Sequence, residues 1–264
     1  MIKKLKGSGL SDILIAFKKI NMILFISLSD LNARYKNSIL GPLWISIGTG
    51  IFVFGIGFLW SEILNKEPSN FLPSLSVGII FWQFISSCLS DSTTIYTNKI
   101  SLIKNIKLPL FMFPLQVLLR QIINFGHNAI ILIIILFFFE VNLNIEFLLC
   151  FPFFLIFIFN MLWIALVMSI IGARFKDFHF VVVSILPIIF FITPVLYQLP
   201  DIGLFSKLLL LNPFTHLIEM IRNPLIGNEL NLFSVYFSII FLLVGWIFTI
   251  LFFNRTRDRI IFWI

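Results

Sequence analysis

The chain has 264 residues, of which 59 % are hydrophobic and only 12 % are charged, and its formal net charge is +7. Soluble domains carry about 25 % charged residues, so this composition excludes a soluble globular protein and predicts one integral membrane domain over residues 1–264. The basic residues lie mostly in alternate loops between long apolar runs, as membrane topology requires, so we expect no nucleic-acid partner.

Residues 10–36 are predicted to form one amphipathic helix. Its longest uncharged run, residues 20–29, is too short to span a bilayer, and charged residues such as Asp12, Lys19 and Asp30 lie off its apolar face. A helix lying in the membrane interface, with its lysines toward anionic lipid, is therefore favoured over a soluble cytosolic helix. The apolar face consists of residues three and four positions apart: Ile13, Phe17, Ile20, Leu24, Leu28, Leu31 and Tyr35.

Six long apolar runs follow and predict six transmembrane helices within residues 41–253. The first run contains no charged residue and, at about 1.5 Å per residue, covers roughly 30 Å, the thickness of the hydrocarbon core. Between the runs, 15 Lys and Arg residues fall on one side of the membrane and 3 on the other, so the positive-inside rule places both termini in the cytosol. The six runs are residues 41–61, 71–90, 109–139, 147–173, 178–199 and 232–253.

Local patterns add detail to these spans. Gly41, Gly48 and Gly55 recur every seven residues near one face of the first span, where another backbone could approach closely. Pro187 and Pro194 are expected to kink the fifth span twice in the same direction. Both patterns are also consistent with plain packing. Between the second and third spans, isoleucines and lysines over residues 98–109 predict one short basic helix.

The last external loop carries helix signals at both ends. An apolar run over residues 204–211 precedes Asn212 and Pro213, a capping residue followed by proline at the first helical position. A helix over residues 213–226 would pair Glu219 with Arg222 and end at Gly227. An external loop that is this apolar is expected to dip back into the membrane.

Sequence motifs for catalysis are absent. No glycine-rich phosphate-binding loop of the G-x-x-x-x-G-K-[ST] type occurs, so the chain is not expected to hydrolyse ATP by that route. No group of His, Cys, Asp and Glu has metal-ligand spacing, and all 12 acidic residues lie in loops or at span ends. This distribution weakens any intramembrane proton or cation relay. We therefore expect a non-enzymatic chain without a cofactor or metal of its own.

The third predicted span contains a polar stripe. Gln116, Arg120, Asn124 and His127 fall within an arc of roughly 80° on a helix that turns about 100° per residue, and Asn128 follows directly. Such residues face the interior of a bundle or a wet cavity, because an arginine facing lipid costs at least about 2.5–3.5 kcal/mol. Two interpretations stay open: a pore wall that meets hydroxyl groups or phosphate, and hydrogen bonding between helices.

Motifs spread along nearly the whole chain carry a family resemblance. They include Arg34-Tyr35-Lys36, Ser38, Leu40, Gly41-Pro42-Leu43-Trp44, Asn98, Leu102-Ile103, Leu108-Pro109, Gly172-Ala173-Arg174-Phe175-Lys176-Asp177, Pro194, Asn212-Pro213, Glu219, Arg222 and residues 259–263. With these motifs the chain resembles the permease subunit of type-2 ABC exporters, in the subfamily that exports O-antigen and related polysaccharides. The resemblance implies a homodimer of permeases in the bacterial inner membrane. It also implies two separate ATPase subunits that bind ATP and Mg²⁺, and an undecaprenyl-diphosphate-linked polysaccharide as cargo.

The resemblance also assigns roles to particular segments. Residues 10–29 match the family's interface helix, and residues 204–226 match its external gate helices, with Asn212, Pro213, Glu219 and Arg222. A second cytosolic contact matches Arg174, Lys176 and Asp177. The coupling helix that contacts the ATPase matches Asn98, Lys99, Leu102, Ile103, Lys104 and Lys107.

Two alternatives remain beside a polysaccharide exporter. Related type-2 ABC permeases move teichoic acid, capsule or drugs. A membrane-embedded glycosyltransferase or ligase belongs to a different class and would need catalytic carboxylates near a large loop outside the membrane. The longest external connection here is mainly apolar, which counts against that class.

Overall fold

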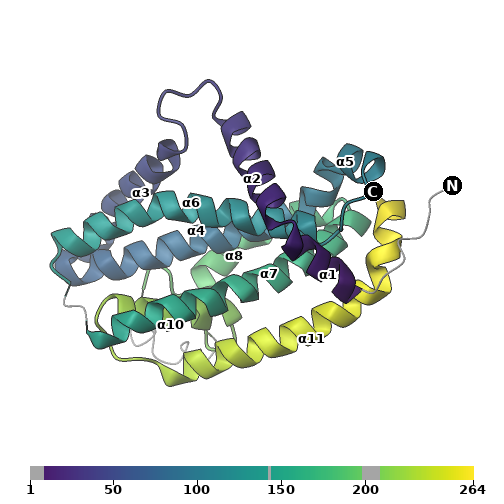
Figure 1. Cartoon of the computed structure of the whole chain (residues 1–264). Helices are drawn as coiled ribbons and strands as arrows, with labels where there is room; N and C mark the ends of the chain where they lie inside the picture. The colour runs from purple at the N-terminus through teal and green to yellow at the C-terminus, as the bar shows by residue number, and fades with distance from the viewer. Residues whose placement is uncertain (1–8, 142–143, 198–208) are drawn as a thin grey trace.

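The computed structural model describes residues 9–141, 144–197 and 209–264, and over these residues all regular structure is helical (Figure 1). The predicted all-α class is therefore confirmed for the described part of the chain. In chain order the helices are α1 (Gly9–Lys18), α2 (Ile20–Arg34), α3 (Leu43–Ile63), α4 (Pro68–Asn98), α5 (Ile100–Asn105), α6 (Met112–Phe138), η1 (Ile145–Leu149), α7 (Cys150–Arg174), α8 (Phe178–Ile192), α10 (Pro213–Leu225) and α11 (Leu232–Trp263).

The segment predicted as one amphipathic helix forms two helices, α1 and α2, that meet at Lys19. The backbone of Lys19 (φ −101°, ψ 21°) leaves the helical region, so α1 lies against α11 and α2 turns to lie against α6 (Figure 1). Asp12, which the sequence places off the apolar face, is nevertheless buried, because its carboxylate pairs with Arg257 of α11. A partner distant in sequence thus decides the burial of this residue.

Five helices are long and apolar enough to cross a membrane by length and composition: α3, α4, α6, α7 with the preceding η1, and α11. The predicted fifth span corresponds to α8, which has only 15 residues. It ends at Ile192 because proline disfavours the helical region for the residue before it, and Thr193 is extended (ψ 135°). The expectation that Pro194 kinks a helix was therefore wrong. Residues 198–199 of this predicted span lie outside the described residues, and the count of six spans stays a prediction.

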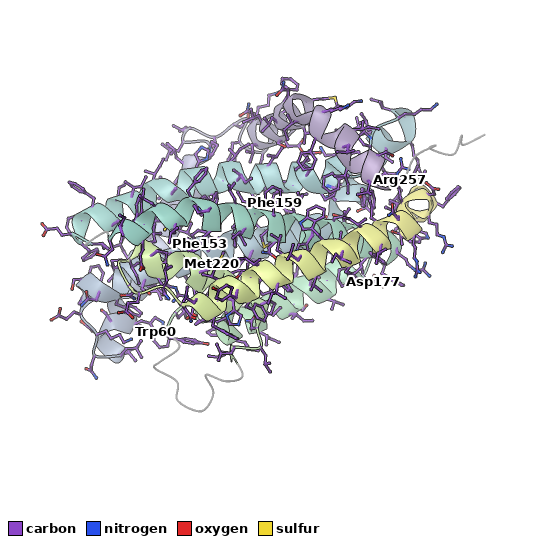
Figure 2. All side chains as sticks on the ribbon, turned by 60° about the horizontal axis from the view of Figure 1, so that its bottom comes forward. Trp60, Phe153, Phe159, Asp177, Met220 and Arg257 are labelled. Atoms are coloured by element: carbon purple, nitrogen blue, oxygen red, sulfur yellow. The ribbon has the colours of Figure 1, made fainter. Side chains whose placement is uncertain are left out.

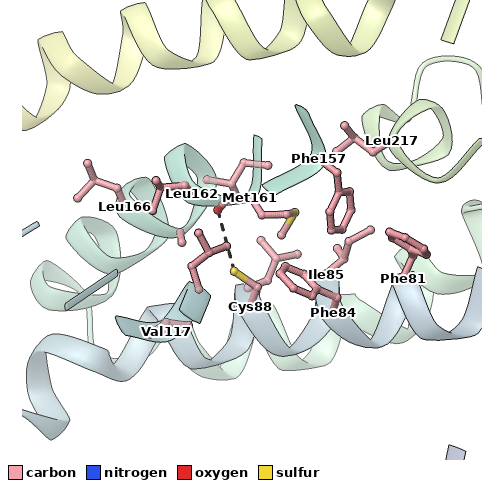
Figure 3. Close-up of a cluster of buried hydrophobic side chains, with 14 of the residues drawn as sticks. Phe81, Phe84, Ile85, Cys88, Val117, Phe157, Met161, Leu162, Leu166 and Leu217 are labelled. Carbon is pink, nitrogen blue, oxygen red and sulfur yellow. Dashed lines mark hydrogen bonds between the residues drawn. The ribbon is translucent and has the colours of Figure 1, made fainter. Parts of the chain in front are cut away.

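Helix α4 is the most deeply buried of these helices and contacts α3, α6, α7, α8 and α10. Aromatic rings fill its contact with α7, where Phe81 and Phe84 lie edge-on to Phe157 (Figure 3). At the other end of this contact, a Cβ on Gly172 would lie 1.9 Å from the Thr93 carbonyl oxygen, so only glycine allows the two backbones to meet. The helix runs eight residues beyond its predicted end and carries Asp91 into the bundle.

The seven-residue glycine pattern of the first span does not mark a close contact within the described chain. Nothing lies within 4 Å of a Cβ built on Gly48 or Gly55. The glycines that meet neighbouring helices are Gly50 and Gly57, where a Cβ would contact Ile131 of α6 and Leu72 of α4. The repeat therefore identified the wrong face of α3 for contacts inside this chain.

The bundle has two distinct ends. Helix α5 and the C-terminal end of α11 lie at one end (Figure 1). Asp177, between α7 and α8, and Arg257 lie at that same end, whereas Trp60 of α3 lies at the other (Figure 2). This arrangement brings together the segments that the charge distribution assigns to one side of the membrane.

Candidate functional site

The polar stripe of α6 faces neighbouring helices rather than the outside of the bundle. Its residues lie three and four positions apart, so one helix face presents them to α2, α3 and α4. Gln116 and Asn128 are buried. His127 behaves differently, because its Nδ1 bonds at 2.8 Å to the carbonyl oxygen of Ile123 in its own helix. Gln116, Arg120 and Asn124 thus lie at the contacts between helices, whereas His127 bonds within its own helix.

Arg120 joins α2 and α4 through two carboxylates. Its Nη2 donates to Asp91 Oδ2 at 2.7 Å, and its Nη1 lies 3.9 Å from Asp30 Oδ2. Gln116 Nε2 donates to Asp30 Oδ2 at 2.7 Å, and Lys99 Nζ pairs with Asp30 Oδ1 at 2.9 Å. We call Asp30, Asp91, Lys99 and Arg120 the charged network. Its two cations and two anions balance, and it connects α2, α4 and α6 directly to the residue that precedes α5.

Amide and hydroxyl groups continue this network toward α3. Gln121 donates to Asp91 Oδ2 at 2.8 Å, and Asn124 donates to Gln121 Oε1 at 3.0 Å. One turn further, Asn128 Nδ2 and Thr49 Oγ1 of α3 both donate to Gln83 Oε1 of α4, at 2.9 and 3.0 Å. The polar contacts therefore extend over several turns of α6 and tie three helices together inside an apolar bundle.

A cavity of about 420 Å³ lies beside these amide groups. Its polar lining includes Gln83, Ser87 and Asn124, and the aromatic rings of Tyr35 and Trp44 also border it. A second cavity of about 260 Å³ borders the charged network. Arg34 and Asp91 line both cavities, and Arg34 forms no ion pair within the described residues.

One acceptor in the larger cavity is not satisfied by the described chain. Asn124 Oδ1 is buried and has no hydrogen-bond partner there. A buried carbonyl oxygen without a donor is unfavourable, and because this atom is not exposed to the cavity, a hydroxyl group or water can satisfy it only after the Asn124 amide turns toward the cavity. The cavity can thus bind a hydroxylated molecule through amides and stack it on aromatic rings. Within the described residues no group of His, Cys, Asp and Glu could hold a metal ion.

Sequence reasoning missed several members of this site. Asp30 and Asp91 were placed at helix ends or in loops, whereas Asp91 lies in α4, well before its end at Asn98. Gln121 was outside the predicted arc because it follows Arg120 by one residue. The available signal was the polar sequence that continues after residue 90, which extends the second span as a helix beyond its apolar part.

The predicted coupling segment forms the short helix α5, with Ile103 buried beneath it and Leu102 packed partly against the core. Lys104 and Lys107 are exposed. Asn98 is exposed and donates to Thr94 Oγ1 at 3.2 Å, and Lys99 belongs to the charged network. This segment therefore presents the exposed Lys104 and Lys107 outward while Lys99 is bonded to Asp30 of α2.

The predicted second cytosolic contact lies between α7 and α8, where Arg174, Lys176 and Asp177 are exposed. The Arg174 guanidinium lies over the rings of Phe175 and Trp263, 5.4 and 5.1 Å from their centres. Asp177 is the residue before α8, but its side chain makes no capping hydrogen bond. The position of these residues at the same end as α5 is compatible with a shared partner, which stays a prediction.

The predicted external helix is present as α10, and Asn212 caps it by accepting from the Phe214 N–H at 3.0 Å. Pro213 occupies its first position, and Gly227 follows with φ +75°. The expected direct pairing of Glu219 with Arg222 is wrong. Glu219 accepts from Ser234 at 3.3 Å, and Arg222 donates to the carbonyl oxygens of Pro194 and Tyr197. Both side chains are recruited by neighbouring elements because α10 is buried among α4, α7 and α11.

The assignment of residues 204–226 as external gate helices stays a prediction. Residues 204–208 of the predicted gate lie outside the described residues. The buried position of α10 is nevertheless the environment in which a helix that re-enters a membrane is tolerated.

Comparisons with known proteins agree with this architecture. The family model described as ABC-2 type transporter matches residues 23–226. Two O-antigen export system permease proteins RfbA of Klebsiella pneumoniae are 25 % and 24 % identical over 249 residues, which cover 90 % of this chain and 93 % of each relative. An RfbA protein of Myxococcus xanthus is 25 % identical over 205 residues, 72 % of this chain and 74 % of that protein. With a family match over most of its length and five helices able to cross a membrane, the chain belongs to the ABC-2 type transporter family.

Proposed function

We propose that the chain is the permease subunit of an ABC exporter that moves a lipid-linked, O-antigen-like polysaccharide across the bacterial inner membrane. Membership of the ABC-2 family implies an ATPase partner. In the proposed assembly, two copies of the chain combine with two ATPase subunits that bind ATP and Mg²⁺. Each copy contributes six spans, with α8 as the fifth, and keeps both termini in the cytosol.

The observation that carries this proposal is the polar cavity with its unpaired Asn124 Oδ1. A sugar presents hydroxyl groups that can hydrogen-bond to the polar lining of the cavity and apolar ring faces that can stack on Trp44. A hydrophobic drug would offer no hydrogen bonds to the polar groups that line the cavity, such as those of Ser87 and Asn124, so the lining favours a hydroxylated cargo over a drug. Teichoic acid and capsule are also hydroxylated, so they stay alternatives within the same transporter class.

Energy coupling is supported by the position of Lys99. This residue lies directly before α5, and its ammonium group bonds Asp30 at 2.9 Å, close to Arg120. A displacement of α5 by an ATPase would therefore act on the charged network and on the cavity that borders it. The exposed Lys104 and Lys107 are positioned to meet acidic groups of that partner.

A glycosyltransferase is disfavoured by the state of the carboxylates. Asp30 accepts from Gln116 and Lys99, and Asp91 accepts from Arg120 and Gln121. A catalytic base must contact the proton that it takes from substrate, whereas both carboxylates are engaged by side chains of neighbouring helices. The contacts therefore favour a structural role for both residues over a catalytic one.

The cargo proposal is tested by Asn124→Leu, with His127→Leu on the same helix as the matched control that does not line the cavity. In cells that lack the native copy, Asn124→Leu should lower surface polysaccharide severalfold per assembled exporter, and the control should not. ATP hydrolysis by the purified complex verifies that the variant assembles. Normal polysaccharide export by Asn124→Leu would refute the assignment of this cavity to the cargo.

The orientation is tested by single cysteines in a background that lacks Cys88 and Cys150. Cysteines at Lys66 and Asn144 should react with an impermeant reagent from outside, and a cysteine at Lys104 should not. Labelling at position 104 in intact cells would contradict the proposed orientation.

A further inference from the structure

A cavity of about 290 Å³ lies between the C-terminal parts of α7 and α11, separate from the site described above. Ile170 and Ile171 of α7 and Phe252 of α11 form much of its lining, so most of its surface is apolar. Arg174 and Arg259 also line it, one from each helix. Within the described residues, no acidic side chain borders this cavity.

The two arginines are available to a ligand. Both are exposed, and neither forms an ion pair within the described residues. The Arg174 guanidinium lies over the ring of Trp263, 5.1 Å from its centre, and this ring also borders the cavity. A ring face attracts the charge of a guanidinium but does not occupy all of its N–H donors. Arg174 can therefore still donate hydrogen bonds to a ligand. The site thus combines fixed positive charge with an apolar wall.

Its position corresponds to the depth of lipid headgroups. α7 and α11 are both helices able to cross a membrane, and the cavity lies near their ends on the side of Asp177 and Arg257 (Figure 2). Under the orientation proposed above, on which this inference rests, that side is cytosolic. Basic pockets between transmembrane helices at the cytoplasmic surface bind anionic lipid headgroups, and tryptophan is enriched at this depth.

We infer that this cavity binds an anionic phospholipid of the cytoplasmic leaflet. The lipid phosphate accepts hydrogen bonds from Arg174 and Arg259, and the first part of an acyl chain lies along Ile171 and Phe252. A zwitterionic lipid carries its own cation next to the phosphate and gains less from two arginines. The bound lipid would join the end of α7 to the end of α11 at a place where the helices leave a gap.

The lipid fits this cavity better than an ATPase subunit does. Lys176 and Asp177, the other members of the predicted second cytosolic contact, do not line the cavity. An apolar wall between two spanning helices also matches an acyl chain, whereas a soluble partner offers few apolar groups at that depth. Arg174 can therefore be tested for lipid binding separately from its neighbours.

The test is a titration of the purified full-length chain in nonionic detergent with dioctanoyl-phosphatidylglycerol, and with dioctanoyl-phosphatidylcholine for comparison, followed by thermal shift. Arg174→Gln with Arg259→Gln should weaken phosphatidylglycerol binding about 25-fold, since each cation near an anionic lipid contributes roughly fivefold. The matched control, Lys176→Gln with Arg255→Gln, removes the same charge from the same two segments outside the cavity. It should bind like the wild type.

A third variant separates the cavity from general surface charge. Thr256→Phe keeps both arginines but places a ring in the cavity, and it should also lose the preference for phosphatidylglycerol. The proposal would be overturned if phosphatidylglycerol bound the double arginine variant as tightly as it binds the wild type. It would also be overturned if the wild type bound phosphatidylglycerol no better than phosphatidylcholine. If the arginine variant instead fails to co-purify an ATPase subunit from cells while it binds phosphatidylglycerol normally, the arginines serve a protein partner and the lipid site is refuted. None of these outcomes depends on the identity of the exported cargo.

Discussion

Replacement of Arg120 by methionine separates the two interpretations of the α6 stripe. The change removes the 2.7 Å bond to Asp91 and the attraction at 3.9 Å to Asp30. Arg120 is 11 % exposed, whereas the Asp91 and Asp30 side chains are 29 % and 25 % exposed. Breaking a fully buried ion pair costs about 3–5 kcal/mol, but these carboxylates keep contact with solvent and one or more other donors. We therefore expect a loss of about 2 kcal/mol in the free energy of unfolding, the size of one hydrogen bond to a charged group.

The assay combines unfolding of the purified chain in detergent with export per assembled complex in cells. Arg34→Met is the control, because Arg34 lines both cavities without an ion pair in the described chain, and its loss should change stability by less than about 0.5 kcal/mol. A double-mutant cycle of Arg120→Met with Asp91→Asn should give a coupling energy of about 1–2 kcal/mol.

The bracing role of Arg120 would be refuted by one combination of results. If Arg120→Met is as stable as Arg34→Met, yet its export per assembled complex falls sharply, the guanidinium acts on cargo and does not hold the helices. Reduced stability with unchanged export per assembled complex would instead remove Arg120 from the transport path.

Two further predictions concern the end of the bundle that carries α5. Asp12→Asn should lower the free energy of unfolding by about 3 kcal/mol, because it breaks a buried ion pair in which Arg257 Nε and Nη2 both donate to Asp12 Oδ1, at 3.1 and 2.9 Å; the exposed Asp258→Asn is the control, and equal stability of the two variants would contradict this. Lys104→Glu with Lys107→Glu should abolish export while the amount of membrane-inserted chain stays constant, measured by immunoblot beside surface polysaccharide. Wild-type export by that pair would remove the coupling assignment from α5.

Features that depend only on residues close to one another in the sequence were predictable from the sequence. About 20 consecutive apolar residues can satisfy their backbone in lipid only as a helix, so α3, α4, α6, α7 and α11 follow from hydropathy. The start of α10 followed from Asn212 and Pro213, because a cap acts within its own turn. The face of α6 that is polar followed from helical periodicity alone.

The tertiary structure decided which groups these faces meet. Arg120 finds Asp91 29 residues away, and Asp12 finds Arg257 245 residues away, and no periodic pattern specifies such partners. The neighbouring elements also decide that Asp12 is buried and that Glu219 and Arg222 bond to other groups and not to each other. They likewise decide that Gly57, and not Gly55, lies against a neighbouring helix. The sequence by itself determined the helices and their polar faces, because these depend on local hydrogen bonding and on the solvent. Only the packing of the helices against one another determined the charged network and the cavities, because each requires side chains from two or more separate elements.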